Sequence, residues 1–210
     1  MVDRAGYLRW RPVEADTPLH RDHWFWHPHD EATLKSVSEL VDTYNKTVGR
    51  GAQLMIGIAP DDTGKLPAAD AARLHEFGDA IRRIYGTNLV KDHNPNTGGD
   101  AALDNDPDTF WTTPAGSHHA MLEVDFPHPI TFDRALTMER LNEGQSVQQY
   151  AIEFFDHGAW KRLAGAQAIG HKKIDIFPAV TAQRVRLNLI STVREASIRE
   201  FQLYNGSAAK

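Results

Sequence analysis

The spacing of hydrophobic residues changes once along the chain, near residue 88. Before that point, apolar residues recur every three or four positions over 34–48 and again over 67–85, which predicts two amphipathic helices, the first ending at Gly49. Between them, 52–60 is an almost continuous apolar run of strand length, as expected of a parallel strand that is buried on both faces. The order helix, strand, helix predicts an α/β segment.

After residue 88 the hydrophobic period becomes two, which is typical of half-buried antiparallel strands. Shorter candidate strands lie at 130–138, 172–177 and 198–204, and the turn signals "NEGQ", "DHGAW" and "FPAVTA" stand between strands. An all-β sandwich of about 115 residues fits this spacing. The alternating apolar positions are Leu122, Val124 and Phe126, then Tyr150, Ile152 and Phe154, and finally Val185, Leu187 and Leu189.

Composition excludes several classes of function. The formal net charge is -5 and the Lys and Arg residues are scattered, so the chain has no basic patch for nucleic acid. The absence of Cys excludes disulfides, thiolate catalysis and Cys-ligated zinc. No apolar run approaches about 18 residues, and residues 1–20 lack the apolar core of a signal peptide. We therefore expect no membrane contact and a soluble, cytoplasmic chain as given.

Several long stretches resemble one enzyme family. "WRPVEADTPLHRDHWFWH", "LKSVSELVDTYNKTVGRGAQLMIGIAPDDTG" and "DAARLHEFGDAIRRIYG" resemble the last part of the catalytic barrel of α-L-fucosidases of glycoside hydrolase family 29. "AALDNDPDTFW", "ALTMERLNEGQSVQQYAIEFF", "AIGHKKIDIFPAVTAQRVRLNLI" and "IREFQLYN" resemble the discoidin-like β-sandwich that follows the barrel in many of these enzymes, which are often exported. Together these stretches cover nearly all of residues 8–205.

The resemblance implies an α/β remnant of a (β/α)8 barrel, followed by an all-β discoidin-like (galactose-binding-like) jelly-roll sandwich. The barrel part would occupy 1–87, a linker 88–100 and the sandwich 101–210, which could also serve as a carbohydrate-binding module. One strand and two helices cannot close a parallel sheet, and a barrel typically takes about 250 residues. We therefore expect the chain to begin inside the barrel.

Members of the family are retaining exo-hydrolases that use an Asp nucleophile and, in many members, a Glu acid/base. The Glu of the W-x-P-x-E-x-D stretch matches Glu14. A general acid must keep its proton at neutral pH, and an aromatic surround such as Trp10, Trp24 and Trp26 would disfavour the ionised form. The resemblance thus implies that Glu14 is the acid/base; the alternative is a surface Glu in an extended loop.

The family's nucleophile lies upstream of this stretch, and Asp3 has no matching context. Asp16 would lie on the same side of an extended segment as Glu14, whereas a nucleophile must face the acid from the opposite side of the sugar. We therefore expect Asp16 to have an orienting or structural role and not to be the nucleophile. Trp24 and Phe25 are candidates for the wall against fucose's methyl face, with plain barrel packing as the alternative.

Two functions follow as hypotheses. The chain is the C-terminal segment of a retaining exo-α-L-fucosidase that acts on fucosylated glycans, inactive alone because its nucleophile is missing, with the other barrel half or a second copy as partner. Alternatively, it is a non-catalytic carbohydrate-binding or structural β-sandwich module with a barrel remnant. Whether the chain by itself is an enzyme stays open. Trp111 and Trp160 are expected to fill the sandwich core, which leaves the sugar site of such a module unassigned.

Metal chemistry is considered at two places. The first is a group of four histidines whose spacings can bind zinc: His20, His23, His27 and His29. A zinc site also needs further ligands and hydrogen bonds that orient the imidazoles, and the sequence does not place these.

The second place is "LDNDPDTFW", which alternates Asp104, Asp106 and Asp108 as an EF-hand does, yet its sixth position is Thr109 instead of Gly. The resemblance implies a structural Ca²⁺ here, and no cofactor for catalysis; the alternative is an Asx-rich turn without metal. The implied calcium ligands are Asp104, Asp106, Thr109 and Glu200.

Overall fold

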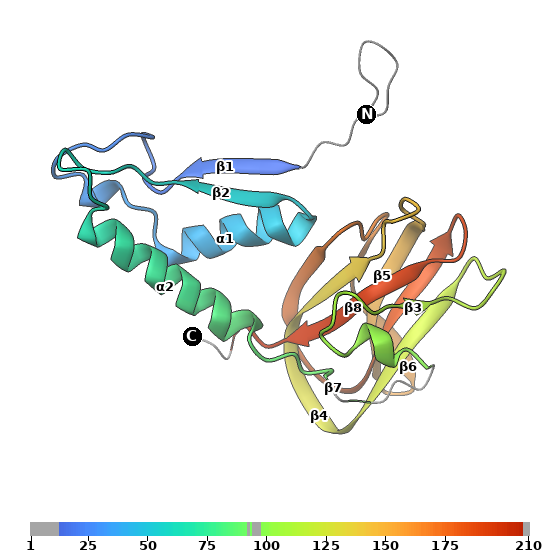
Figure 1. Ribbon diagram of the computed structural model, residues 1–210. Helices are drawn as coiled ribbons and strands as arrows, with labels where there is room; N and C mark the ends of the chain where they lie inside the picture. The colour runs from blue at the N-terminus through green and yellow to red at the C-terminus, as the bar shows by residue number, and fades with distance from the viewer. Residues whose placement is uncertain (1–12, 92, 94–97, 208–210) are drawn as a thin grey trace, which may run out of the picture. The chain divides into compact units, whose positions relative to one another are not determined.

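The computed structural model describes residues 13–91, 93 and 98–207, and the chain divides into two compact units (Figure 1). The first unit runs to Asp79 and the second begins at Ala80, so the boundary falls within a helix. Each unit is described by itself. In the described part of the chain, no helix has both the length and the apolar character that a membrane span requires.

The first unit is an α/β segment, as the hydrophobic pattern predicts. Strand β1 (Glu14–Pro18) pairs in parallel with β2 (Gln53–Gly57), and helix α1 (Val37–Thr47) connects them. Helix α2 (Ala68–Tyr85) follows and begins directly after Pro67, a residue that suits a first helical turn. Short 3-10 turns cover Glu31–Thr33 and Val48–Arg50.

The start of α1 differs from the prediction. The helix begins at Val37 because Ser36 and Glu39 form a capping box, whereas Leu34 lies in an isolated bridge with His20. The helix ends at Thr47, and the 3-10 turn that follows it closes at Gly51, whose φ of 82° is the left-handed conformation that favours glycine. The predicted stop at Gly49 therefore lies within two residues of the end of α1 at Thr47.

The prediction that the strand in 52–60 is parallel is confirmed, but burial on both faces is wrong. Met55 of β2 is exposed, and so is Ile58, which follows the strand. The small core of this unit comprises Leu19, Leu34 and Leu40, against which Ile56, Ala69, Leu74 and Phe77 pack.

The second unit is a single antiparallel sheet that curls over one core. Its strands are β3 (Trp111–Thr112), β4 (Ala120–Glu139), β5 (Val147–Asp156), β6 (Ala159–Ala166), β7 (Lys173–Thr192) and β8 (Ser197–Tyr204), in the order β3-β8-β4-β7-β5-β6. A 3-10 turn covers Asp100–Ala102. In Figure 1, the long strands β4 and β7 run through both sides of the sandwich.

The segment "FPAVTA", predicted as a turn, lies inside β7. Thr131 pairs with Thr181 and Phe132 with Val180, and shifts of register before and after these pairs bend the two strands together. Bulges of this kind let a strand turn a corner without ending, so the turn residues mark a bend instead of a break.

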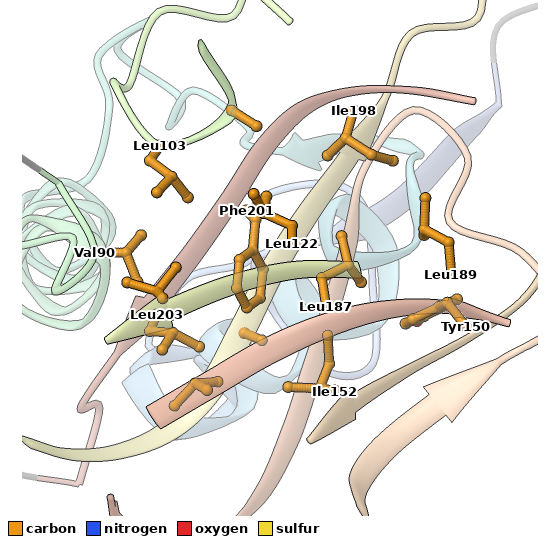
Figure 2. Packing of buried hydrophobic residues seen from close by; sticks show 14 of the residues in the cluster. Val90, Leu103, Leu122, Tyr150, Ile152, Leu187, Leu189, Ile198, Phe201 and Leu203 are labelled. Carbon is orange, nitrogen blue, oxygen red and sulfur yellow. The ribbon is translucent and has the colours of Figure 1, made fainter. Parts of the chain in front are cut away.

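Side chains from all parts of the sheet meet in the core (Figure 2). The alternating apolar positions of the three predicted stretches, which fall in β4, β5 and β7, are buried as predicted, except that Phe154 is only partly covered. Val90, from the segment 88–100, is fully buried in this core. Trp111 packs against the core, whereas Trp160 lies outside it, with the Arg186 guanidinium 4.1 Å from its ring centroid.

The last turn of α2 packs on the sandwich. The ring of Tyr85 meets that of Tyr204 edge to face, with centroids 5.2 Å apart, and its hydroxyl lies 3.5 Å from Nη1 of Arg134. Both contacts lie within the second compact unit, which begins at Ala80.

Candidate functional site

Strand β1 carries both carboxylates of the W-x-P-x-E-x-D stretch. Glu14 pairs opposite Gln53 and Asp16 opposite Met55, and both side chains are exposed. Side chains two apart on a strand point to the same face, and the rise per residue places their Cα atoms about 6.5–7 Å apart. The predicted extended geometry is confirmed, while Trp10 and Asp3 lie outside the described residues.

The two candidate substrate-binding aromatics lie in the loop that leaves the carboxyl end of β1. Trp24 is 51% exposed and Phe25 79% exposed. The indole of Trp24 covers Gly57, the last residue of β2. Active sites of (β/α) barrels lie at the carboxyl ends of the parallel strands, so this is the end where substrate contacts are expected.

Glu14 and the indole of Trp24 lie at opposite ends of the strand pair. Glu14 is the first residue of β1, and Pro18, which pairs with Gly57, is its last. The rise of four strand residues separates the Cα atoms of Glu14 and Pro18 by about 13 Å. A ligand in contact with both side chains would therefore have to lie between them, along the exposed face of β1.

Lys35 is a residue at this end of the sheet that sequence reasoning missed. Its ammonium group donates to Oγ1 of Thr17, at 2.5 Å, and to the carbonyl of Pro18, and burial lowers the pKa of Lys35. Arg73 of α2 donates to the carbonyl of Lys35. These bonds tie the loop to the carboxyl end of β1; a lone Lys before a helix cap offers no sequence signal for this role.

Among the four histidines, the structure brings two to a common carboxylate. His20 and His23 both face Asp30, whereas His29 is exposed in a left-handed turn with φ of 63°. The ring of His27 contacts His23 edge to face, with centroids 4.5 Å apart. Asp30 is the third candidate ligand that spacing alone did not identify.

In the second unit, oxygens of the loop 101–109 converge on one hydroxyl. Oγ1 of Thr109 lies 3.0 Å from the carbonyl oxygen of Ala101, 2.8 Å from Oδ2 of Asp104 and 2.9 Å from the carbonyl oxygen of Asp106. A hydroxyl has a single hydrogen and can satisfy only one of these acceptors. Such crowding of hard oxygen atoms is typical of a Ca²⁺ site.

Glu200 completes this arrangement from β8. The residue is 1% exposed, and its Oε1 is buried without a hydrogen-bond partner among the described atoms. Burial raises the pKa of Glu200 to about 7, and the nearby charges of Asp104 and Asp106 add to the increase. Its Oε2 accepts from Nε2 of Gln202 at 2.9 Å. An unmatched buried carboxylate oxygen beside two aspartates fits a divalent cation with oxygen ligands.

A cleft of about 270 Å³ lies elsewhere on the sandwich. The guanidinium of Arg140 lies 4.5 Å from the centroid of the exposed Phe110 ring. The strand period of two could have identified Phe110 from the sequence. If Trp111 points to the core, its neighbour Phe110 must point outward. The cleft is lined by Phe110, Thr112, Arg140, Glu143, Gly144, Ser146, Arg194, Glu195 and Ser197.

Comparison with known proteins finds a separate family match for each of the two units. The Alpha-L-fucosidase family model matches residues 3–86, and the F5/8 type C domain model matches residues 87–201. Alpha-L-fucosidase 1 of Arabidopsis thaliana is 24% identical over 188 residues, which are 83% of this chain and 37% of that protein. These matches confirm the resemblance that the sequence motifs carry.

Solved structures agree in fold. A Ruminococcus gnavus fucosidase of glycoside hydrolase family 29, determined in complex with fucose, superposes with a TM-score of 0.83 at 26% identity, over 95% of this chain and 43% of that one. A family 29 glycoside hydrolase from a rumen bacterium gives a TM-score of 0.76 at 28% identity, over 94% and 33%. The chain thus spans less than half the length of each of these relatives.

Proposed function

The chain belongs to the F5/8 type C domain family through its second unit, and because its first unit matches the α-L-fucosidase family model, we propose that it forms part of a retaining exo-α-L-fucosidase. Its substrate would be terminal α-L-fucose on glycoconjugates. The observation that carries this proposal is the family match over 3–86, which includes the parallel pair β1–β2 and the exposed Glu14.

In the proposed mechanism Glu14 is the acid/base. It would first protonate the departing glycosidic oxygen and then remove a proton from the water that resolves the glycosyl-enzyme. Trp24 and Phe25, open at the carboxyl end of the strands, would cover the apolar face of the fucose ring. Asp16 shares a face with Glu14, so it would orient the acid or a sugar hydroxyl and leave the attack to an opposed carboxylate.

The opposed carboxylate would come from a barrel segment or a second copy outside the described residues. Retaining hydrolysis needs two carboxyl groups about 5–5.5 Å apart on opposite sides of the sugar. We therefore expect the purified 210-residue chain to show no enzymatic turnover of an aryl α-L-fucoside. Turnover should appear once a segment that carries the family's nucleophilic Asp is supplied.

The leaving-group dependence of such a completed enzyme tests the role of Glu14. A general acid matters in proportion to how much the departing oxygen needs its proton, and its loss costs about 10²–10⁴-fold. Glu14→Ala should therefore slow substrates with poor leaving groups far more than those with good ones. Equal slowing of both substrate classes would contradict the assignment.

For the sandwich, we propose a structural Ca²⁺ held by Asp104, Asp106, Thr109 and Glu200. The convergence of oxygens on Thr109 and the unmatched Oε1 of Glu200 support this set. The ion would neutralise three carboxylates and link the loop to the last strand, a structural role with no part in the hydrolysis.

A second candidate function is carbohydrate binding by the sandwich, favoured by the cleft beside Phe110. An exposed aromatic ring next to charged groups suits a sugar, because the ring takes the apolar face and the polar groups take the hydroxyls. Phe110→Ala should abolish binding of fucose or galactose in calorimetry, while Met121→Ala, an exposed residue outside the cleft lining, should not. Unaltered binding by Phe110→Ala would exclude the cleft.

A further inference from the structure

The loop between β1 and α1 gathers three metal-ligating side chains. His20, His23 and Asp30 each offer one ligand atom, and these atoms lie within 4.8 Å of one another. Oδ2 of Asp30 is 3.6 Å from Nδ1 of His20 and 3.3 Å from Nε2 of His23. The three side chains are only 12%, 18% and 14% exposed, respectively, so the cluster is largely shielded from water.

Each imidazole makes a hydrogen bond on the side away from Asp30, and these bonds determine which ring nitrogens carry a hydrogen. Nε2 of His20 lies 3.3 Å from both carboxylate oxygens of Asp70, and Nδ1 of His23 lies 2.7 Å from the carbonyl oxygen of Phe25. A carboxylate or a carbonyl only accepts, so these nitrogens must donate. The nitrogens toward Asp30 then carry lone pairs in the neutral rings.

Two lone pairs and a carboxylate oxygen therefore face one another. The hydroxyl of Thr33 lies 2.7 Å from Nδ1 of His20 and 3.4 Å from Nε2 of His23, but its single hydrogen can serve only one acceptor. Three acceptor atoms at these separations repel one another unless a proton or a metal cation lies between them.

We propose that His20, His23 and Asp30 bind Zn²⁺. Zinc accepts imidazole nitrogen and carboxylate oxygen at about 2.0–2.2 Å in tetrahedral geometry, so neighbouring ligand atoms are about 3.3–3.5 Å apart. The separations around Asp30, 3.3 and 3.6 Å, match that value. Two imidazoles favour zinc over calcium or magnesium, which take oxygen ligands. A water or the Thr33 hydroxyl supplies the fourth ligand.

The outer partners have the arrangement that metal-binding histidines require. Asp70, from α2, orients His20 as a carboxylate–histidine–zinc triad does, and the Phe25 carbonyl orients His23. The metal would bind two ends of the loop together and so position Trp24 and Phe25, which lie between them. This site is separate from the oxygen ligands at 101–109.

Zinc titration of the full 210-residue chain tests the proposal. After removal of metals with chelator, the chain is titrated with Zn²⁺ by calorimetry in excess Ca²⁺, which saturates the oxygen site. One equivalent of Zn²⁺ should bind, and Asp30→Asn should lower its affinity more than 100-fold. Loss of an outer partner typically costs 10–100-fold, so Asp70→Asn should weaken binding by that factor while leaving every ligand in place.

Control variants separate this site from adventitious binding to other histidines. His29→Ala and His75→Ala remove imidazoles that are not part of the cluster and should bind Zn²⁺ as the unaltered chain does. Co²⁺ should give the visible spectrum of a four-coordinate ion, and Asp30→Asn should abolish it. Absence of one-equivalent binding, or unchanged affinity in both Asp30→Asn and Asp70→Asn, would overturn the proposal.

Discussion

The indole of Trp24 lies so close over Gly57 that a β-carbon at position 57 would come within 2.8 Å of its Cε3 atom. Real β-carbons do not approach ring atoms that closely, so glycine is required wherever the indole keeps this position. Gly57 also accepts a hydrogen bond from the N–H of Leu19, which holds the start of the loop. The last residue of β2 therefore sets where a candidate substrate-binding ring lies.

Gly57→Ala should displace the Trp24 ring. The added methyl forces the indole away from β2, which should shift the Trp24 indole N–H signal in a ¹H–¹⁵N spectrum and destabilise the first unit by about 1–3 kcal/mol, as overpacking does. The signal is assigned by its absence in Trp24→Phe. In a Trp24→Ala background, the destabilisation caused by Gly57→Ala should largely vanish, because no indole is left to displace. An unshifted signal would contradict the close packing.

Chelation of Ca²⁺ should lower the melting temperature of the sandwich. A ligand that binds only the folded state at a hundredfold excess over Kd contributes about 2.7 kcal/mol, or on the order of 10 °C for a unit of this size. Asp104→Ala should abolish the response. Asp108→Ala, in the same loop but outside the proposed ligand set, should retain it. A melt that does not respond to chelator would exclude the calcium site.

Asp133 should make the sandwich lose stability in acid. Burial alone would raise the pKa of Asp133, but hydrogen bonds from Arg134, Ser207 and the Gly206 N–H outweigh it and lower the pKa from 3.8 to about 2. The folded state thus favours the ionised form. Its stabilisation of about 2 kcal/mol is complete above about pH 4 and is lost as the pH falls toward 2.

The difference in the free energy of unfolding between the unaltered chain and Asp133→Asn isolates the contribution of Asp133. Asp133→Asn should be less stable at pH 7, because it leaves the buried guanidinium of Arg134 without its anion. The difference between the two chains in the free energy of unfolding, measured with denaturant, should become smaller as the pH falls from 4 to 2. A gap that stays constant over that range would show that Asp133 does not ionise differently in the folded state.

Asp16→Asn should leave most activity in a completed enzyme. Asp16 points to the same face of β1 as Glu14, so if Glu14 is the proposed acid/base, Asp16 is not placed to attack from the opposite side of the sugar. We expect kcat to fall by less than about tenfold, against the 10²–10⁴-fold cost of a lost acid/base. Turnover by the 210-residue chain that disappears in Asp16→Asn would make Asp16 the nucleophile.

The sequence by itself determined the order of elements and the two kinds of packing. A period of three to four predicts helices and a period of two predicts half-buried strands, because side chains repeat with the geometry of the backbone. The positions Leu122, Val124 and Leu187 follow from that alone, and all are buried. The motif around Glu14 likewise indicated the family before any contact was known.

Only the tertiary structure decided what lies beside what. The bend inside β7 and the burial of Val90 depend on contacts with distant residues that local patterns do not encode. The same holds for the candidate metal sites. Asp70 reaches His20 across fifty positions of sequence, and Glu200 reaches the loop at Asp104 across almost a hundred, because folding brings α2 to the β1 loop and β8 to the start of the sandwich. Ligand sets are defined by such distances in space, which spacing along the chain does not determine.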